Sequence, residues 1–242
     1  MERNNIFSIL NIQGGEASQQ SALMLARTFS EKLKKRTVYI PAGITFDDTG
    51  SLSLTELYHD FLKSKDFRFD KNESLLIVKP FNCFAEFLEI RGDTYIEFVN
   101  KISSLFDISI INIDNLSSEM ILYFIESSVT TAIIIDCNQS NYASRFENFM
   151  RNLKILWGKS LPEHMDKFIF IINKGSETEK LLINNIALRE SGCEDYDFNS
   201  KIYFPENNFL SSKTLFNNKP EKTVFSVFRN ISKKAEGLFN AK

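Results

Sequence analysis

A glycine-rich turn near the N-terminus is the segment of this sequence best suited to chemistry. Residues 11–26 read NIQGGEASQQSALMLA, so Gly14 and Gly15 join an apolar run to a segment with helical spacing of apolar residues. Backbone N–H groups at such a turn point at an anion, and the helix dipole adds positive potential. A working phosphate loop also supplies a lysine and a Ser or Thr hydroxyl. This turn has no lysine and carries Glu16, so a turn that serves only packing is the alternative.

Other reactive side chains are too scattered to predict a metal site or a catalytic residue. Cys83, Cys137 and Cys193 lie far apart and match no zinc, redox or disulfide spacing, which favours a reducing, intracellular setting. The histidines, His59 and His164, have no partner at ligand spacing. We therefore expect no metal and no Ser/His/Asp or Cys/His catalysis.

The composition narrows the class of protein. The chain has 242 residues, of which 43% are hydrophobic and 25% are charged, and its formal net charge is -2. This balance is typical of a folded globular protein and disfavours binding to nucleic acid. The N-terminal apolar run is too short for a signal peptide and no stretch is long enough to cross a bilayer, so we expect a cytoplasmic protein.

The elements that must position the turn alternate between strands and helices. The candidate strands are short, β-rich apolar runs at 6–12, 37–41, 74–80, 108–113, 131–136, 167–173 and 201–205. Apolar stripes at helical spacing run through 16–35, 54–61, 95–105 and 142–157, and the polar residues 174–180 and 191–200 are expected to be loops. Consecutive apolar strand residues indicate burial on both faces. The order predicts one domain, residues 1–242, with a doubly wound, mostly parallel α/β sheet of about seven strands flanked by helices.

The chain has 23 phenylalanines, most of them at strand or helix-stripe positions such as Phe98, Phe106, Phe149 and Phe170. Large aromatic side chains at such positions are expected in the core. An exposed aromatic patch for a protein partner remains the alternative at FRF, residues 67–69, and FNCFAEF, residues 81–87.

The residues around the turn resemble the deviant Walker A ATPases of the MinD/ParA group. That family has a strand, the motif K-G-G-x-G-K-[ST]-T and a helix, and QGGEASQQSALMLA fits the same frame without a gap. In this alignment Gln13 takes the place of the first lysine, Ser18 that of the second, and Gln19 that of the magnesium-binding hydroxyl. The resemblance implies a P-loop NTPase-like fold with vestigial nucleotide-binding positions at Gly14, Gly15, Ser18 and Gln19.

Other segments also follow the family's layout but lack its acidic groups. The second strand ends in Pro41 and Ala42, where the family has an aspartate that helps to activate water. FDISIINID, residues 106–114, resembles F-D-Y-[IV]-[IV]-[IV]-D-x-P, with Asn112 at the position of the metal-associated aspartate. Asn173 aligns with the asparagine that contacts adenine. The resemblance continues into the C-terminal region and covers nearly the whole chain.

These departures predict a protein that does not hydrolyse ATP. Hydrogen bonds to charged groups contribute about 1.5–3 kcal/mol each, so losing two lysine contacts removes about 3–6 kcal/mol, or about two to four decades of affinity. The missing carboxylates leave little to hold magnesium or to orient water. No cofactor is expected. Weak binding of ATP or ADP stays open as an alternative, because the backbone donors of the turn remain.

Within the family the chain looks most like the TadZ/CpaE branch, which helps to assemble tight-adherence (type IVb) pili. Residues 50–67 and 80–90 carry this likeness. It implies an inactive localisation or assembly scaffold for a pilus or secretion machine, with protein partners, acting as a nucleotide-independent homodimer at the inner face of the membrane or the cell pole. A nucleotide switch with a remodelled loop and a membrane- or DNA-associated positioning protein are the alternatives.

The last helical stripe, residues 223–239, has one apolar face with Lys222, Arg229, Lys233 and Lys234 around it. A basic amphipathic helix of this kind binds anionic membranes in some proteins. The family places a core-packing helix at this point, so we expect packing rather than membrane contact.

Overall fold

The fold is an eight-stranded parallel sheet flanked by helices. The computed structural model describes residues 6–14, 16–41, 50, 52–67, 73–82, 90–114, 116–193 and 196–203. The strands are β1 (Ile6–Asn11), β2 (Thr37–Pro41), β3 (Leu52–Ser53), β4 (Leu75–Lys79), β5 (Ile108–Asn112), β6 (Thr130–Asp136), β7 (Phe168–Asn173) and β8 (Ile202–Tyr203). They are hydrogen-bonded in the order β3-β4-β2-β5-β1-β6-β7-β8.

Helices follow most of the strands. They are α1 (Glu16–Arg27), α2 (Leu54–Ser64), α4 (Gly92–Ser103), α5 (Ser118–Ser127), α6 (Tyr142–Trp157), α7 (Leu161–Met165) and α8 (Glu177–Ser191). A π-helical turn, Thr28–Lys32, continues α1, and 3₁₀ turns lie at Gly158–Ser160 and Phe198–Lys201.

The predicted doubly wound parallel sheet is confirmed, and two details of the prediction are wrong. β3 was not expected, because a strand of two residues is too short to show a periodicity. Residues 174–180 were expected to be a loop, but α8 begins at Glu177. The strand expected at 201–205 occurs as β8, and its last two positions lie outside the described residues, as do Gly15, Ala42, Cys83 and the stripe at 223–239.

The chain divides into two compact units, one of Met1–Ile9 with Ser21–Val129 and the other of Leu10–Gln20 with Thr130–Lys242. Strand β1 therefore contributes residues to both units. We describe each unit by itself, and the single domain over residues 1–242 stays a prediction.

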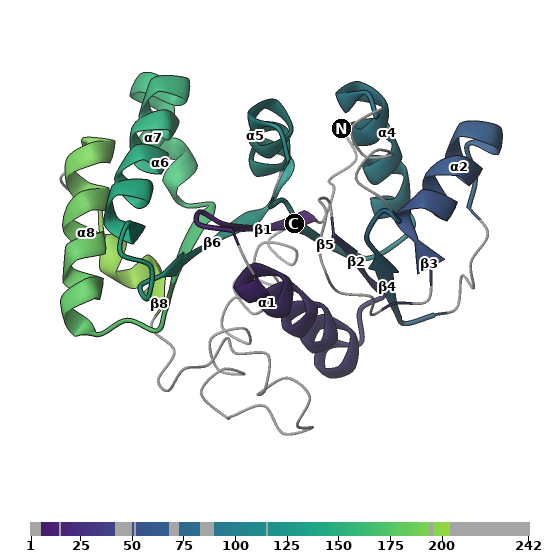
Figure 1. Cartoon of the computed structure of the whole chain (residues 1–242), viewed down its shortest axis with the longest axis horizontal. Coiled ribbons are helices and arrows are strands. Elements are labelled where there is room, and N and C mark those ends of the chain that lie inside the picture. The colour runs from purple at the N-terminus through teal and green to yellow at the C-terminus, as the bar shows by residue number, and fades with distance from the viewer. Residues whose placement is uncertain are drawn as a thin grey trace. The chain divides into compact units, whose positions relative to one another are not determined.

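The first unit places helices on both faces of its strands. Figure 1 shows α2, α4 and α5 on one face and α1 on the other. Every residue of β2 and β5 is buried, as expected for strands covered on both sides. Phe98 on α4 is fully buried and forms the centre of an aromatic cluster, with its ring centroid 5.2 Å from that of Tyr58 and 5.6 Å from that of Phe61. This cluster joins α2 to α4.

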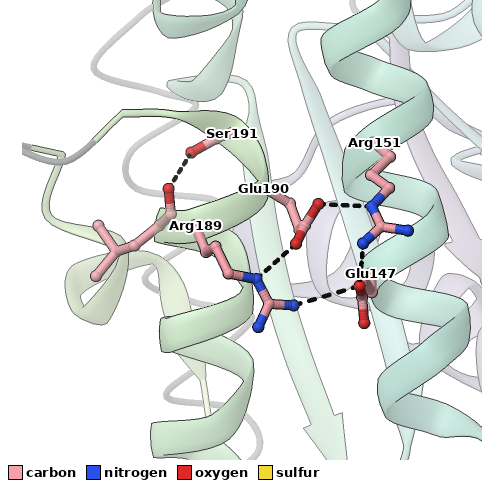
Figure 2. A network of polar contacts seen from close by, with 6 residues as sticks. Glu147, Arg151, Arg189, Glu190 and Ser191 are labelled. Atoms are coloured by element: carbon pink, nitrogen blue, oxygen red, sulfur yellow. Dashed lines mark hydrogen bonds and ion pairs between the residues drawn. The ribbon is translucent and has the colours of Figure 1, made fainter.

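The second unit packs α6 and α8 next to each other (Figures 1 and 2) and holds strands β6, β7 and β8. Phe170 on β7 is fully buried, and its ring lies 5.4 Å from that of Phe146 on α6, edge to face. The predicted burial of Phe98 and Phe170 is confirmed, whereas Phe149 on α6 is only half-buried.

A capping box explains why α8 begins inside a polar stretch. The Ser176 N–H donates to Glu179 Oε2 at 2.7 Å, and Ser176 Oγ accepts from the Thr178 N–H at 3.3 Å. These bonds satisfy donors at the first turn that have no partner within the helix. The Ser176 hydroxyl also donates to the Glu179 carboxylate, and this bond, followed by the one from the Ser176 N–H, lowers the pKa of the Glu179 carboxyl group.

Replacing Ser176 with alanine is expected to lower the free energy of unfolding by about 0.5–2 kcal/mol, because the N-cap acceptor is lost. Urea unfolding followed by circular dichroism measures the change. Ser176→Thr is the matched control, since it keeps a hydroxyl at the cap and should lose little stability. Equal losses in both variants would contradict a capping role.

Candidate functional site

Hydrogen bonds within the turn itself fix the conformation of the glycine turn. β1 ends at Asn11, whose main-chain oxygen accepts from the Gly14 N–H at 3.0 Å and whose Oδ1 accepts from the Gln13 N–H at 3.0 Å. Gly14 has a φ of 74°, a left-handed conformation that favours glycine. A Cβ at Gly14 would meet no atom within 4 Å, so the conformation rather than crowding requires the glycine. Two N–H groups at the start of the turn are therefore bonded to Asn11.

The side chain of Gln13 continues the pairing of β1 beyond its last residue. Its Nε2 donates to the main-chain oxygen of Asp136 at 3.2 Å, and its Oε1 accepts from the Asp136 N–H at 2.9 Å. One carboxamide thus bonds to both backbone groups of Asp136, in the way that a residue of an antiparallel strand would. Gln13 aligns with the first lysine of the family motif. Both polar atoms of its side chain are thus bonded to the end of β6.

Arg145 brings a positive charge next to the turn. This residue lies in the first turns of α6, and its Nη1 donates to the main-chain oxygens of Ile12 and Gln13 at 3.4 and 3.5 Å. The guanidinium faces carbonyl oxygens, and its side chain is exposed. Sequence reasoning missed Arg145, because no motif links it to a turn more than 130 residues earlier in the chain.

The next two predicted positions are buried on α1. Ser18 has no exposed surface and Gln19 is 8% exposed. Gln20, which follows them, is equally buried, and its Oε1 accepts no hydrogen bond from the described residues. The structure therefore brings Gly14, Ser18 and Gln19 together at the start of α1, with the two side chains covered.

Asn173 lies at the end of β7, directly beside the strand residue that holds Gln13. Asp136 and Asn173 are partners in the β6–β7 register, and the Asn173 main-chain oxygen accepts from the Cys137 N–H at 3.0 Å. The Asn173 side chain is fully buried, and neither its nitrogen nor its oxygen bonds to any residue that the structure describes. The second unit thus gathers Gln13, Asp136 and Asn173 at one end of its strands.

Asn112 belongs to the first unit, where it lies beside the end of β2. It pairs in register with Pro41, so a proline ring and a carboxamide lie side by side at the ends of β2 and β5. Asn112 is 1% exposed, and its Oδ1 accepts from the Asp114 N–H at 3.2 Å. Asp114, also buried, is a carboxylate that the motif alignment did not single out.

The described residues form no cluster of three or more His, Cys, Asp or Glu side chains suited to a metal ion. Cys137 is no activated nucleophile: burial, with smaller contributions from Glu179 and Asp136, raises the pKa of its thiol to about 12. A thiol with this pKa is protonated at neutral pH and therefore weakly nucleophilic. Among helices in the described part of the chain, none has both the length and the apolar character needed to cross a membrane.

No family model and no curated protein matches the sequence. Solved structures do match. A ParA family ATPase from Chlorobium tepidum TLS is 13% identical, with a TM-score of 0.67 over 95% of this chain and 98% of that one. The septum site-determining protein MinD from Pyrococcus horikoshii OT3, complexed with Mg-ADP, is 13% identical, with a TM-score of 0.59 and 98% of each chain covered. The MinC:MinD complex from Aquifex aeolicus gives a TM-score of 0.58 at 11% identity, covering 95% of this chain and 96% of that one. The chain has the P-loop NTPase fold of the ParA and MinD proteins.

Proposed function

We propose that this protein is a catalytically inactive relative of the ParA/MinD ATPases. It acts as a localisation or assembly scaffold for a surface apparatus, such as a tight-adherence pilus or a secretion system. The observation that carries the proposal is Gln13, whose carboxamide is bonded at both ends to Asp136.

The bonded glutamine supports the loss of nucleotide-dependent activity. In the MinD/ParA family, members dimerise face to face across nucleotide, and the first lysine reaches into the partner's site. Gln13 carries no charge, and releasing it would break two hydrogen bonds worth about 0.5–1.5 kcal/mol each. Its neutral amide would then make weaker contacts with phosphate than a lysine makes. Releasing Gln13 from Asp136 would therefore add little to the free energy of nucleotide binding.

The ends of β2 and β5 support the loss of hydrolysis. Pro41 and Asn112 lie side by side, and neither offers a carboxylate to magnesium or to an attacking water. The Asn112 oxygen is also engaged by the Asp114 N–H. A neighbouring side chain can compensate for the loss of one such group. Here both lysines and both carboxylates of the family motif are absent at the aligned positions, so compensation for all of them is not expected.

A scaffold of this kind works through protein contacts. One similar structure is a complex of MinD with MinC, so a protein of this fold can bind another protein. The likeness to the TadZ/CpaE branch points to partners in a pilus or secretion machine. The protein would then act in the cytoplasm at the inner face of the membrane or at the cell pole, as a nucleotide-independent homodimer.

Thermal unfolding with ATP–magnesium, ADP and GTP tests the proposal. A ligand at one hundred times its dissociation constant stabilises by about 2.7 kcal/mol, or about 5–10 °C for a protein of this size. We expect no change in Tm with any of the three at millimolar concentration. The double variant Gln13→Lys/Ser18→Lys returns both lysines and serves as the comparison.

A rise in Tm of the native protein with ATP would contradict the proposal. It would favour the nucleotide switch, in which Arg145 supplies the charge that the turn lacks. Arg145→Ala should then remove the ATP-dependent rise, because its guanidinium is the cation bonded to the turn.

A further inference from the structure

The C-terminal end of α6 carries apolar side chains that the rest of the chain leaves uncovered. Ile155 is 82% exposed, more than any other large apolar residue that the structure describes, and Leu156 next to it is 42% exposed. The stripe that α6 buries consists of Phe146, Met150 and Leu153. The exposed hydrocarbon of Ile155 and Leu156 therefore lies outside the core.

Trp157 extends this apolar surface to the end of the helix. Its ring is half-buried and stacks on the His164 ring of α7, with centroids 4.5 Å apart and planes inclined by 14°. Gly158 follows with a φ of 51°, and a Cβ there would meet no atom within 4 Å, so the turn has open space beside it. Scattered apolar residues are common on protein surfaces, whereas a contiguous group marks an interaction site. We call Ile155, Leu156 and Trp157 the α6 tip.

The charged residues around the α6 tip leave it with a positive excess. Between residues 154 and 167 the chain has three lysines and two acids, which are Lys154, Lys159, Lys167, Glu163 and Asp166. Asp166 Oδ1 lies 3.3 Å from Lys201 Nζ, and this ion pair offsets one of the acids. Arg151, one helical turn before the tip, is bonded to Glu147 and Glu190 and adds nothing to the excess (Figure 2). The tip is therefore apolar and flanked by cations.

These features favour a lipid surface over a second protein. A specific protein contact buries about 800 Å² on each partner, while the tip exposes two large apolar side chains and part of a third. A helix that docks in a protein groove presents residues at i, i+3 and i+4 spacing, whereas the exposed residues here are successive. A bilayer interface accepts a small apolar surface with an aromatic ring at headgroup level, and anionic lipids attract lysines. Nucleic acid would also attract the lysines, but its phosphates would leave the hydrocarbon uncovered.

We propose that the α6 tip inserts into the interface of an anionic lipid bilayer, whose headgroups attract the flanking lysines. The inference rests on the proposed function, because it supplies a contact that holds the scaffold at the inner face of the membrane. The stack on His164 orients the Trp157 ring in advance, so insertion requires little ordering of the tip. This surface is separate from the glycine turn and from residues 223–239.

Fluorescence of Trp157 tests the proposal directly. Trp157 is the sole tryptophan of the chain, so its emission reports on the α6 tip alone. Vesicles of equal parts phosphatidylcholine and phosphatidylglycerol should shift the emission of the full chain to shorter wavelength, and phospholipids brominated on their acyl chains should quench it. Vesicles of phosphatidylcholine alone should bind at least about fivefold more weakly, which is the effect of one lysine near an anionic surface.

Co-sedimentation with the same vesicles tests the side chains of the tip. Ile155→Ser should lower the partition coefficient by about tenfold or more, because a polar group replaces hydrocarbon that insertion would bury, and Leu156→Ser should lower it less. Leu181→Ser is the matched control, since Leu181 is 59% exposed in the first turns of α8 and should leave binding unchanged. The tip ends α6, and α6 and α8 run in the same direction, so Leu181 lies at the opposite end of the helix pair (Figure 2).

A lack of binding to the anionic vesicles would overturn the proposal. So would bound protein whose Trp157 emission is neither shifted nor quenched, because another part of the chain would then make the contact. Neither result bears on the proposed loss of nucleotide binding, which is measured without lipid. An ATP-dependent rise in Tm would in turn overturn only the proposed function, since the vesicle measurements are made without nucleotide.

Discussion

Replacing Phe98 with alanine is expected to lower the free energy of unfolding by about 3–5 kcal/mol. The Phe98 ring is fully buried and contacts aromatic rings from α2 and from its own helix, with the Tyr58 and Tyr95 centroids at 5.2 and 5.9 Å. Alanine would remove these contacts and leave a cavity, since fully buried neighbours can close it only in part.

Chemical unfolding with urea measures this loss, and a fall of about 6–20 °C in Tm should accompany it. Leu62→Ala, on the exposed side of α2, is the control and should change stability by about 0.5 kcal/mol or less. A loss below about 1 kcal/mol for Phe98→Ala would mean that the aromatic cluster does not hold α2 and α4 together.

Replacing Asn173 with leucine is expected to raise the free energy of unfolding by about 1–3 kcal/mol. The side-chain amide is fully buried, and neither polar atom finds a partner among the residues that the structure describes. A buried amide without hydrogen bonds has lost its contacts with water and gained none in return. Leucine has the same branched arrangement of four side-chain heavy atoms and brings no polar atom to that site.

Urea unfolding of the Asn173→Leu variant and of the native protein measures the difference in their free energies of unfolding. Asn173→Asp is the comparison, because it keeps the shape, adds a buried charge and should destabilise. A lower stability of Asn173→Leu would show that the amide has a partner after all. If ATP stabilised the native protein and not this variant, Asn173 would be a working nucleotide contact.

The order of strands and helices could be predicted because the buried strands are continuous apolar runs. β2 and β5 are buried at every position. Continuous apolar runs of this length are typical of strands inside a sheet that helices cover on both faces. The start of α8 was missed for the opposite reason. Polar composition suggested a loop at 174–180, whereas Ser176 and Glu179 in that stretch form a capping box that starts a helix.

The candidate site could be predicted only in part. The turn at Gly14 follows from local sequence, because a strand, a left-handed residue and a helix come in succession. The bond from Gln13 to Asp136 joins residues 123 positions apart, and the contact of Arg145 depends on where α6 begins. Such contacts arise from packing between distant segments, which no local pattern specifies.

Because Gln13 pairs with β6, hydrogen exchange at two neighbouring backbone amides reports two different opening motions. The Asp136 N–H is bonded to the Gln13 side chain, while the next amide, Cys137 N–H, is bonded to the main chain of β7 at Asn173. Exchange at Asp136 therefore reports each release of the turn, and exchange at Cys137 reports separation of β6 from β7. The free energy of opening the turn can thus be read apart from the stability of the sheet, in the protein as it stands and without any ligand.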